Sequence, residues 1–232
     1  MKMNFILSKI KKVIKKKKLL AIISSENNTS PLLNKERLMT LMDGHPYIHD
    51  DEIILLATMT KKNIGPIVEI GCAFGASSSI FLLYGKEGVK LHSIDPFVRD
   101  SMGAFHANEN LCRKNVLGTL KAFKKEKKYA DWNLHTDHSY NIVKNWKETV
   151  ETIFIDGDHN YDAVKKDFED WFPFVKKDGY ILLHDSRKEE GTPADTFNRG
   201  WAGPTKFVNE LINSDRVVLV NEVFSVTVWQ KR

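Results

Sequence analysis

Short apolar runs alternate with segments of helical periodicity along most of this chain, beginning near residue 67. The apolar runs are bounded by polar residues or glycine and have the length and composition of buried strands. The expected strands cover residues 67–70, 90–94, 132–134, 152–155 and 180–183, and the expected helices between them cover 77–83, 108–123, 139–144 and 161–174. Strands that alternate with helices form crossover units, so this pattern predicts a mostly parallel sheet.

The last part of the chain departs from this alternation. A helix expected at 204–212 is followed by two apolar runs, 217–220 and 223–229, which only Asn221 and Glu222 separate. A link this short cannot cross over a sheet, so the final strand must run antiparallel. The sequence therefore predicts an α/β fold, doubly wound and Rossmann-like, with a mostly parallel seven-stranded sheet and a C-terminal antiparallel strand. Two earlier helices, expected at 31–41 and 50–59, would cover the sheet edge or the site.

The N-terminal segment differs from the rest of the chain. Eight of the first twenty residues are lysine and none is acidic, while the apolar side chains recur at helical spacing. We expect a basic amphipathic arm and linker over residues 1–30 and one folded domain over 31–232. The arm could lie on an anionic membrane surface as a peripheral contact, or it could be a solvated tail that packs on a neighbouring subunit of a homo-oligomer.

Composition narrows the class of protein and its partners. Removing the eight arm lysines from the 35 basic residues leaves 27 against 30 acidic ones, so we expect no nucleic-acid partner. Lysines interrupt the apolar runs of the arm, which argues against a secretory signal or a membrane span there. Cys72 and Cys112 are too few for a disulfide framework. These features favour a cytoplasmic protein, with the inner membrane surface as the alternative that the arm allows.

Polar residues that follow the expected strands are the first candidates for a ligand site, because ligands of open α/β sheets bind at the carboxyl ends of strands. The first strand carries Glu69 and leads into Gly71 and Gly75, a spacing that allows a tight turn into a helix. It differs from the G-x-G-x-x-G spacing of dinucleotide-binding dehydrogenases. Asp95 follows the second strand, where an acid can accept both hydroxyl protons of a ribose. Asp137 follows the third and could face an adenine or only cap the next helix.

Acids and histidines follow two later strands. Asp156 and His159 lie in the run I-D-G-D-H-N-Y, and His184 and Asp185 follow the next strand. The carboxylates of Asp156 and Asp185 suit a hard divalent cation such as Mg²⁺, which could orient substrate hydroxyls and lower the pKa of the one that reacts. His159 is then placed to take its proton as a general base. These residues could instead cap helices and make local hydrogen bonds, but their clustering favours a functional site.

These motifs resemble those of the class I S-adenosylmethionine-dependent methyltransferases, from about residue 67 to residue 229. The segments IDGDHNYDAVKKDFEDW and DGYILLHDS are similar to the branch that includes macrocin-type sugar O-methyltransferases and cephalosporin hydroxylase-like proteins. The resemblance assigns the cofactor roles residue by residue: the methionine part and the turn to Glu69, Gly71 and Gly75, the methionine carboxylate to Ser77, the ribose to Asp95, and the adenine side to Asp137.

The same resemblance implies a metal site with one departure. In the sugar enzymes of that branch, an aspartate after the fourth strand and an acidic pair after the fifth bind the metal, and a nearby histidine is the base. This chain carries His184 where those enzymes often have the first acid of the pair. His184 could therefore be a ligand, a group that supports the ligands, or a substrate contact.

The leading hypothesis is a metal-assisted O-methyltransferase that uses S-adenosylmethionine and acts on a hydroxyl of a sugar or glycosylated small molecule. The long polar segments at 97–110 and 187–203, the second with Trp201, would contribute to the acceptor site. The alternatives are a catechol-type small-molecule methyltransferase and a non-catalytic protein of a polysaccharide assembly system that has kept the nucleotide pocket. A nicotinamide dehydrogenase is the most distant alternative.

Overall fold

The computed structural model describes residues 33–98, 107–193 and 195–232. The arm expected over residues 1–30 lies outside the described residues, as does most of the polar segment expected at 97–110. The alternatives for the arm, and the boundary between arm and domain, therefore stay predictions.

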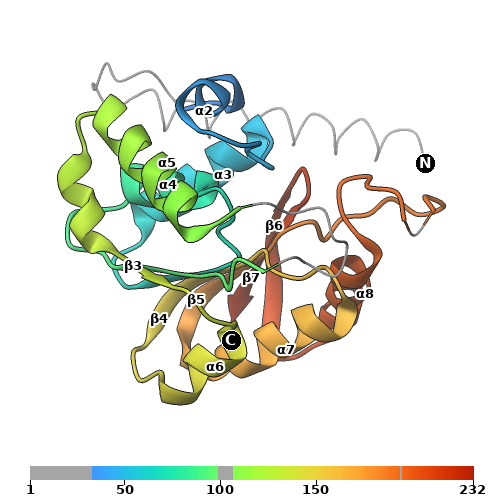
Figure 1. Ribbon diagram of the computed structural model, residues 1–232. Helices are drawn as coiled ribbons and strands as arrows, with labels where there is room; N and C mark the ends of the chain where they lie inside the picture. Colours follow the sequence, from blue (N-terminus) through green and yellow to red (C-terminus); the bar gives the residue numbers. More distant parts are fainter. Residues whose placement is uncertain (1–32, 99–106, 194) are drawn as a thin grey trace, which may run out of the picture. The chain divides into compact units, whose positions relative to one another are not determined.

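Within the described residues, seven strands form one sheet in the order β3-β2-β1-β4-β5-β7-β6. Strands β1 to β5 run parallel to one another, and β7 runs antiparallel to both β5 and β6 (Figure 1). The strands are β1 (Ile67–Ile70), β2 (Leu91–Ile94), β3 (Trp132–His135), β4 (Val150–Ile155), β5 (Val175–Leu183), β6 (Val217–Val223) and β7 (Val226–Lys231). The predicted fold class is confirmed.

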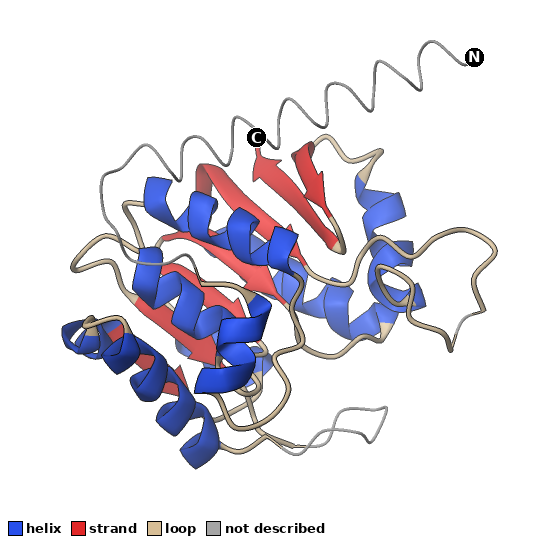
Figure 2. Cartoon of the chain, turned by 90° about the horizontal axis from the view of Figure 1, so that it is seen from above, coloured by secondary structure: helices blue, strands red, loops and turns tan. Residues whose placement is uncertain are grey.

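Helices cover both faces of this sheet (Figures 1 and 2). They are α2 (Lys35–Leu41), α3 (Asp50–Lys62), α4 (Ala76–Tyr84), α5 (Glu109–Ala122), α6 (Ser139–Ile142), α7 (Tyr161–Trp171) and α8 (Ala202–Leu211). Side chains alternate across a strand, so Ile67 packs in the core under α3, α4 and α5, while Val68 packs in the core over α7 and α8. The two apolar layers hold the ends of β1, β4 and β5 in place, and these ends carry most of the predicted site.

The C-terminal hairpin turns later than the sequence predicts. The expected link at Asn221 and Glu222 is wrong, because both residues belong to β6 and the turn lies at Phe224 and Ser225. Phe224 has a left-handed φ of 50°, and Ser225 is buried. Asn221 and Glu222 are polar because β6 is the edge strand of the sheet, where a polar side chain can face solvent without ending the strand.

The start of α3 carries an acid into the interior. The His49 ring accepts a hydrogen bond from the backbone N–H of Asp51 at 3.2 Å, and Glu52 accepts one from the His49 N–H at 2.8 Å. This reciprocal capping satisfies two N–H groups that the first helical turn leaves without partners. Glu52 is only 1% exposed, so the cap also fixes a carboxylate at the buried end of α3.

A buried polar network ties β1 to its neighbours. Glu69 on β1 accepts hydrogen bonds from Ser78 on α4 and Ser93 on β2, and the Trp132 indole of β3 donates to the Ser93 hydroxyl at 2.9 Å. Burial raises the pKa of Glu69 to about 7, against the lowering effect of its serine partners. The network orders the strands beneath the predicted glycine turn.

The ends of β1 and β4 approach each other at Gly71. This residue has a left-handed φ of 84°, and a Cβ on it would lie 2.0 Å from the carbonyl oxygen of Asp156. No side chain can be placed there while the strands keep this separation. Gly71 therefore allows the glycine turn to lie directly against the strand end that carries Asp156.

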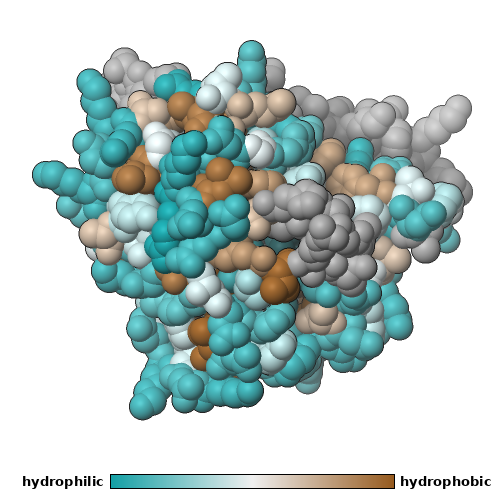
Figure 3. All heavy atoms as spheres, viewed as in Figure 1, coloured by the Kyte–Doolittle hydropathy of each residue, from teal (hydrophilic) through white to brown (hydrophobic). Residues whose placement is uncertain are grey.

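The surface seen in Figure 3 is mostly hydrophilic, and the apolar residues on it form small groups. Among the helices of the described residues, none is long and apolar enough to cross a membrane. The cytoplasmic location stays a prediction.

The approach of β1 to β4 predicts a difference between two glycine substitutions. Gly71→Ala should lower the free energy of unfolding by about 3 kcal/mol, since a left-handed residue and a backbone clash are combined. Gly88→Ala is the matched control: Gly88 also has a positive φ, 79°, but nothing lies within 4 Å of the place that a Cβ would take on it. Gly88→Ala should lower the free energy of unfolding by only about 1 kcal/mol. Urea denaturation measures both, and equal losses would contradict the close approach.

The burial of Glu69 predicts a pH dependence of stability. Its pKa of about 7 in the folded chain exceeds the ordinary value of 4.5, so the folded state binds the proton more tightly and stability falls as the pH rises from 4.5 through 7. This contribution amounts to about 3 kcal/mol. Glu69→Gln should remove it. Denaturation of both proteins at pH 5 and pH 8 tests this, and parallel pH profiles would contradict it.

Candidate active site

The turn after β1 is held by Asp95. Its carboxylate accepts hydrogen bonds from the backbone N–H groups of Cys72 at 3.0 Å, Ala73 at 2.8 Å and Phe97 at 2.7 Å. A carboxylate has about four acceptor positions, so these three donors leave about one for a ligand. The structure thus shows Asp95 as the residue that shapes the turn, and its contact with a ribose stays a prediction.

A pocket opens beside this turn and reaches the acid and histidine cluster. Three parts of the chain line it: the segment 45–48 before α3, the turn and the start of α4, and the ends of β4 and β5. The lining residues are His45, Pro46, Tyr47, Ile48, Gly71, Cys72, Ala73, Phe74, Ala76, Ser77, Phe154, Asp156 and His184. Of the predicted cofactor residues, Gly71 and Ser77 line this pocket. Segment 45–48 is not among the site residues predicted from the sequence, although an apolar Pro-Tyr-Ile run directly before a helix was a usable signal.

Two predicted cofactor residues lie behind the pocket wall. Glu69 is fully buried beneath α4, and among the described residues its Oε1 has no hydrogen-bond partner. Gly75 caps α4 with a φ of 87°, and a Cβ on it would lie 2.6 Å from a Val116 methyl carbon of α5. Both residues therefore shape the turn from behind, and their direct contact with the cofactor stays a prediction.

Asp137 lies on the surface after β3. Its Oδ1 accepts hydrogen bonds from the His138 N–H at 2.7 Å and from the Asn141 side chain at 3.0 Å. The Asn141 hydrogen bond, followed by the His138 one, lowers the pKa of Asp137. These contacts are local, but helix α6 has its N-cap at His138 and no side-chain cap hydrogen bond, so Asp137 does not cap it. The adenine role of Asp137 stays a prediction.

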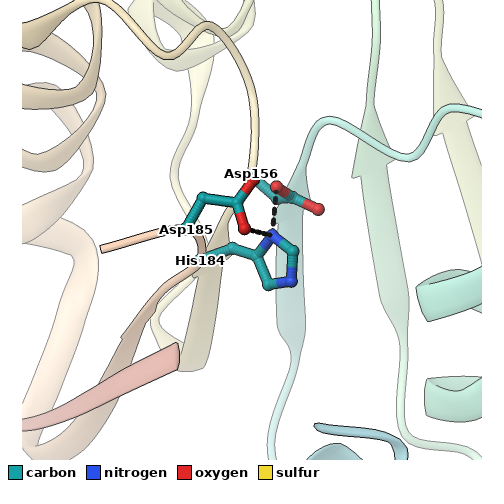
Figure 4. Close-up of side chains that lie close together, drawn as sticks. All are labelled: Asp156, His184 and Asp185. Atoms are coloured by element: carbon teal, nitrogen blue, oxygen red, sulfur yellow. Dashed lines mark ion pairs between the residues drawn. The ribbon is translucent and has the colours of Figure 1, made fainter. Parts of the chain in front are cut away.

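The ends of β4 and β5 bring two acids onto one imidazole. The Nδ1 of His184 lies 2.8 Å from Oδ1 of Asp156 and 3.3 Å from Oδ1 of Asp185 (Figure 4). One ligand atom from each of the three residues lies within 4.8 Å of the others, so the group could hold a metal ion. Asp185 has a left-handed φ of 49°, which is uncommon for a residue with a side chain and is often found at functional sites.

His159 completes the cluster from the other side of Asp185. Its Nε2 lies 3.2 Å from Oδ2 of Asp185, and its side chain is 22% exposed. Burial acts to lower the pKa of His159, but the contact and charge of Asp185 and the charge of Asp156 outweigh it and raise the pKa. Its ring also lies 6.0 Å from that of Trp201, which in turn lies 5.5 Å from Phe197. A partly exposed imidazole beside a carboxylate and an aromatic pair could exchange a proton with a bound molecule.

Glu52 is a site residue that the sequence analysis missed. Its Oε2 lies 3.4 Å from Nε2 of His184, and its Oε1 accepts hydrogen bonds from the backbone and hydroxyl of Ser225. Its spacing from His49 indicates a helix cap, and nothing in that pattern shows that the same carboxylate reaches β5. His184 consequently lies among three carboxylates.

The charges of this cluster favour a positive group at its centre. Burial acts to lower the pKa of His184, yet the charges of Asp156, Asp185 and Glu52 outweigh it and raise the pKa well above the ordinary value. A proton on the imidazole or a metal ion between the acids would each reduce the repulsion among the carboxylates. The structure brings together the four predicted residues Asp156, His159, His184 and Asp185, and two of them, Asp156 and His184, line the pocket.

Comparison with solved structures identifies similar folds. The O-methyltransferase from Bacillus cereus, solved with S-adenosylhomocysteine, has a TM-score of 0.60 and is 14% identical, with 91% of this chain and 97% of that one covered. The O-methyltransferase TomG from Streptomyces achromogenes, solved with S-adenosylmethionine, has a TM-score of 0.58 at 13% identity and covers 91% and 94%. A Podospora anserina methyltransferase has a TM-score of 0.59 at 16% identity and covers 94% and 95%. These likenesses show a shared fold.

Sequence comparison adds a relative and a family. An uncharacterised protein of Acanthamoeba polyphaga mimivirus is 27% identical over 149 residues, and the matched region spans 63% of this chain and 63% of that relative. A family model described as a methyltransferase domain matches residues 68–186, which is just over half of the chain. The matched residues include the glycine turn, Asp95 and the whole acid and histidine cluster of β4 and β5. The chain therefore belongs to the methyltransferase-domain family, in agreement with the class I methyltransferase fold that its sequence predicts.

Proposed function

We propose that this chain is an O-methyltransferase that transfers the methyl group of S-adenosylmethionine to a hydroxyl oxygen with the help of a divalent cation. The observation that carries this proposal is the meeting of His159, His184 and two aspartates in one cluster. Two of its members, Asp156 and His184, line a pocket that the glycine turn also lines. The family membership and the similar folds of proteins named as O-methyltransferases support the same function.

The proposed reaction is a direct displacement at the methyl carbon. The acceptor oxygen forms a bond to the methyl carbon while the bond from that carbon to sulfur breaks, and S-adenosylhomocysteine leaves. The hydroxyl proton goes to His159, whose imidazolium is then stabilised by the Asp185 carboxylate at 3.2 Å. No covalent intermediate with the protein is needed.

The residues at the strand ends fit a divalent cation. Asp156 and Asp185 would hold it, as proposed from the sequence for Mg²⁺, and the 4.8 Å limit on the separation of their ligand atoms suits one ion. A bound cation would lower the pKa of the acceptor hydroxyl. In the cofactor pocket, Gly71 and Ser77 would contact the methionine part and Glu69 and Gly75 would support the turn. Asp95 would bind the ribose and Asp137 would face the adenine side.

The acceptor site is proposed beside His159. Trp201 and the half-exposed Phe197 present aromatic rings there, and such rings can pack on the apolar face of a sugar. A sugar or glycosylated small molecule, as in the macrocin-type branch, is the proposed acceptor. A catechol would stack on the same rings and offers two adjacent hydroxyls, so a catechol-type methyltransferase is the second candidate.

The proposed cofactor can be tested without knowing the acceptor. Calorimetric titration of S-adenosylhomocysteine should give micromolar binding, and Asp95→Ala should weaken it at least about tenfold, since hydrogen bonds to a charged group are lost and the turn is loosened. Asp170→Ala is the control, because that residue makes a surface ion pair with Lys166. No binding by the unaltered protein would remove the methyltransferase proposal, and binding unaffected by Asp95→Ala would remove the role of Asp95.

The proposed base predicts a separation of binding from transfer. With an acceptor found among monosaccharides, glycosylated small molecules and catechols, His159→Gln should slow methyl transfer by about 10²–10⁴-fold. Its affinity for S-adenosylhomocysteine should not change. His138→Gln, at a partly exposed residue directly before α6, is the matched control and should keep full activity. Transfer at the original rate in His159→Gln would show that another group takes the proton. Binding without transfer to any acceptor would favour the non-catalytic alternative.

A further inference from the structure

We propose that Nδ1 of His184 is a ligand of the cation and that Glu52 positions the His184 ring. The site then prefers an ion that binds nitrogen ligands well, such as Mn²⁺, over Mg²⁺. This inference rests on the cation of the proposed function and names its chemical class. It assigns the third ligand that the sequence left open and gives a role to a residue of α3.

The placement of His184 supports its role as a ligand. The residue is 7% exposed, and its Nδ1 points between Asp156 and Asp185 (Figure 4). This nitrogen is buried and faces one carboxylate oxygen at 2.8 Å and a second at 3.3 Å, so its nearest neighbours are groups that can bind a cation. A cation held by both aspartates would be within reach of the same nitrogen.

Glu52 lies behind the ring, at the nitrogen that faces away from the aspartates. Its Oε2 is 3.4 Å from Nε2 of His184. The carboxylate is itself fixed, because it accepts hydrogen bonds from the His49 N–H at 2.8 Å and from the Ser225 N–H at 3.2 Å. A carboxylate behind a ligand histidine holds the proton on the far nitrogen and leaves the near lone pair for the metal. His184 is placed in this way, with Asp156 at its Nδ1 and Glu52 at its Nε2.

The donor set determines which ion is preferred. Mg²⁺ favours oxygen ligands and keeps several waters, whereas imidazole nitrogen suits first-row transition ions. Two carboxylates and one imidazole should therefore favour Mn²⁺, Fe²⁺, Co²⁺ or Zn²⁺. Replacing His184 with aspartate would restore an oxygen ligand at the position where the similar sugar enzymes often have one.

The test uses the full chain, saturated with S-adenosylhomocysteine, and MnCl₂ and MgCl₂ as probes. Calorimetry should show that Mn²⁺ binds at least about tenfold more tightly than Mg²⁺. Since Mn²⁺ also binds carboxylates, the informative quantity is the ratio of the two affinities, which His184→Asp should lower. Spin-echo modulation of bound Mn²⁺ should show coupling to a ligand ¹⁴N nucleus, and His184→Asp should abolish it.

The role of Glu52 has its own variant. Glu52→Gln should weaken Mn²⁺ binding by about tenfold, as expected when a group that orients a ligand is altered, and should leave S-adenosylhomocysteine binding unchanged. Glu36→Gln, on the exposed first turn of α2, is the control. Thermal unfolding of each variant shows whether it is folded. If His184→Asp does not fold, the echo signal of His159→Gln decides the question: coupling that persists there comes from His184, and coupling that is lost comes from His159.

Several results would overturn this inference and leave the proposed cofactor and methyl transfer intact. They are binding of S-adenosylhomocysteine without any binding of Mn²⁺, bound Mn²⁺ without ¹⁴N coupling, and an affinity ratio that His184→Asp does not change. The first would indicate that a proton on His184 balances the three carboxylates. Failure to bind S-adenosylhomocysteine would instead remove the proposed function itself.

Discussion

Three carboxylates surround one buried imidazole at the end of the sheet, and the rest of the site depends on how their charges are balanced. Glu52, Asp156 and Asp185 come from α3, β4 and the end of β5, so no single element could assemble the group. Like charges brought together away from water repel one another strongly and need a positive partner. A positive group at the centre of the cluster therefore holds the three elements together, and the cluster favours the binding of a cation.

The backbone around this cluster is held in conformations that the sequence alone would not suggest. Asp185 adopts a left-handed φ, and its carbonyl accepts a hydrogen bond from the Trp201 N–H at 2.8 Å. Gly200 lies so close to this carbonyl that a Cβ would be 2.3 Å from it. The long segment that leaves β5 thus returns to hold Asp185. Strained residues of this kind persist only where the surrounding structure determines them, which is common at functional sites.

Local patterns predicted much of this structure, and the failures have physical reasons. The apolar runs located all the parallel strands, because buried strands need such runs whatever surrounds them. The predicted position of the hairpin turn was wrong because Asn221 is a polar residue of an edge strand, and polarity alone does not distinguish an edge strand from a turn. The strand ends also predicted that Asp156, His159 and Asp185 meet, since parallel strands end at one edge. Glu52 was not predictable, because its partners are far away in the sequence and its local pattern already had an explanation as a cap.

The contact between Glu52 and Ser225 joins residues that are 173 positions apart, which has a consequence for the order of assembly. Chains fold from the N-terminus as they are synthesised, so α3 is made long before the hairpin that holds its carboxylate in place. Pairings this distant in sequence form late, because a long loop must be closed first. A chain that still lacked the β6–β7 hairpin would carry all the acids of the cluster, but Glu52 would lack the contact with Ser225 that holds it in place. The site is therefore fully arranged only after the hairpin has formed.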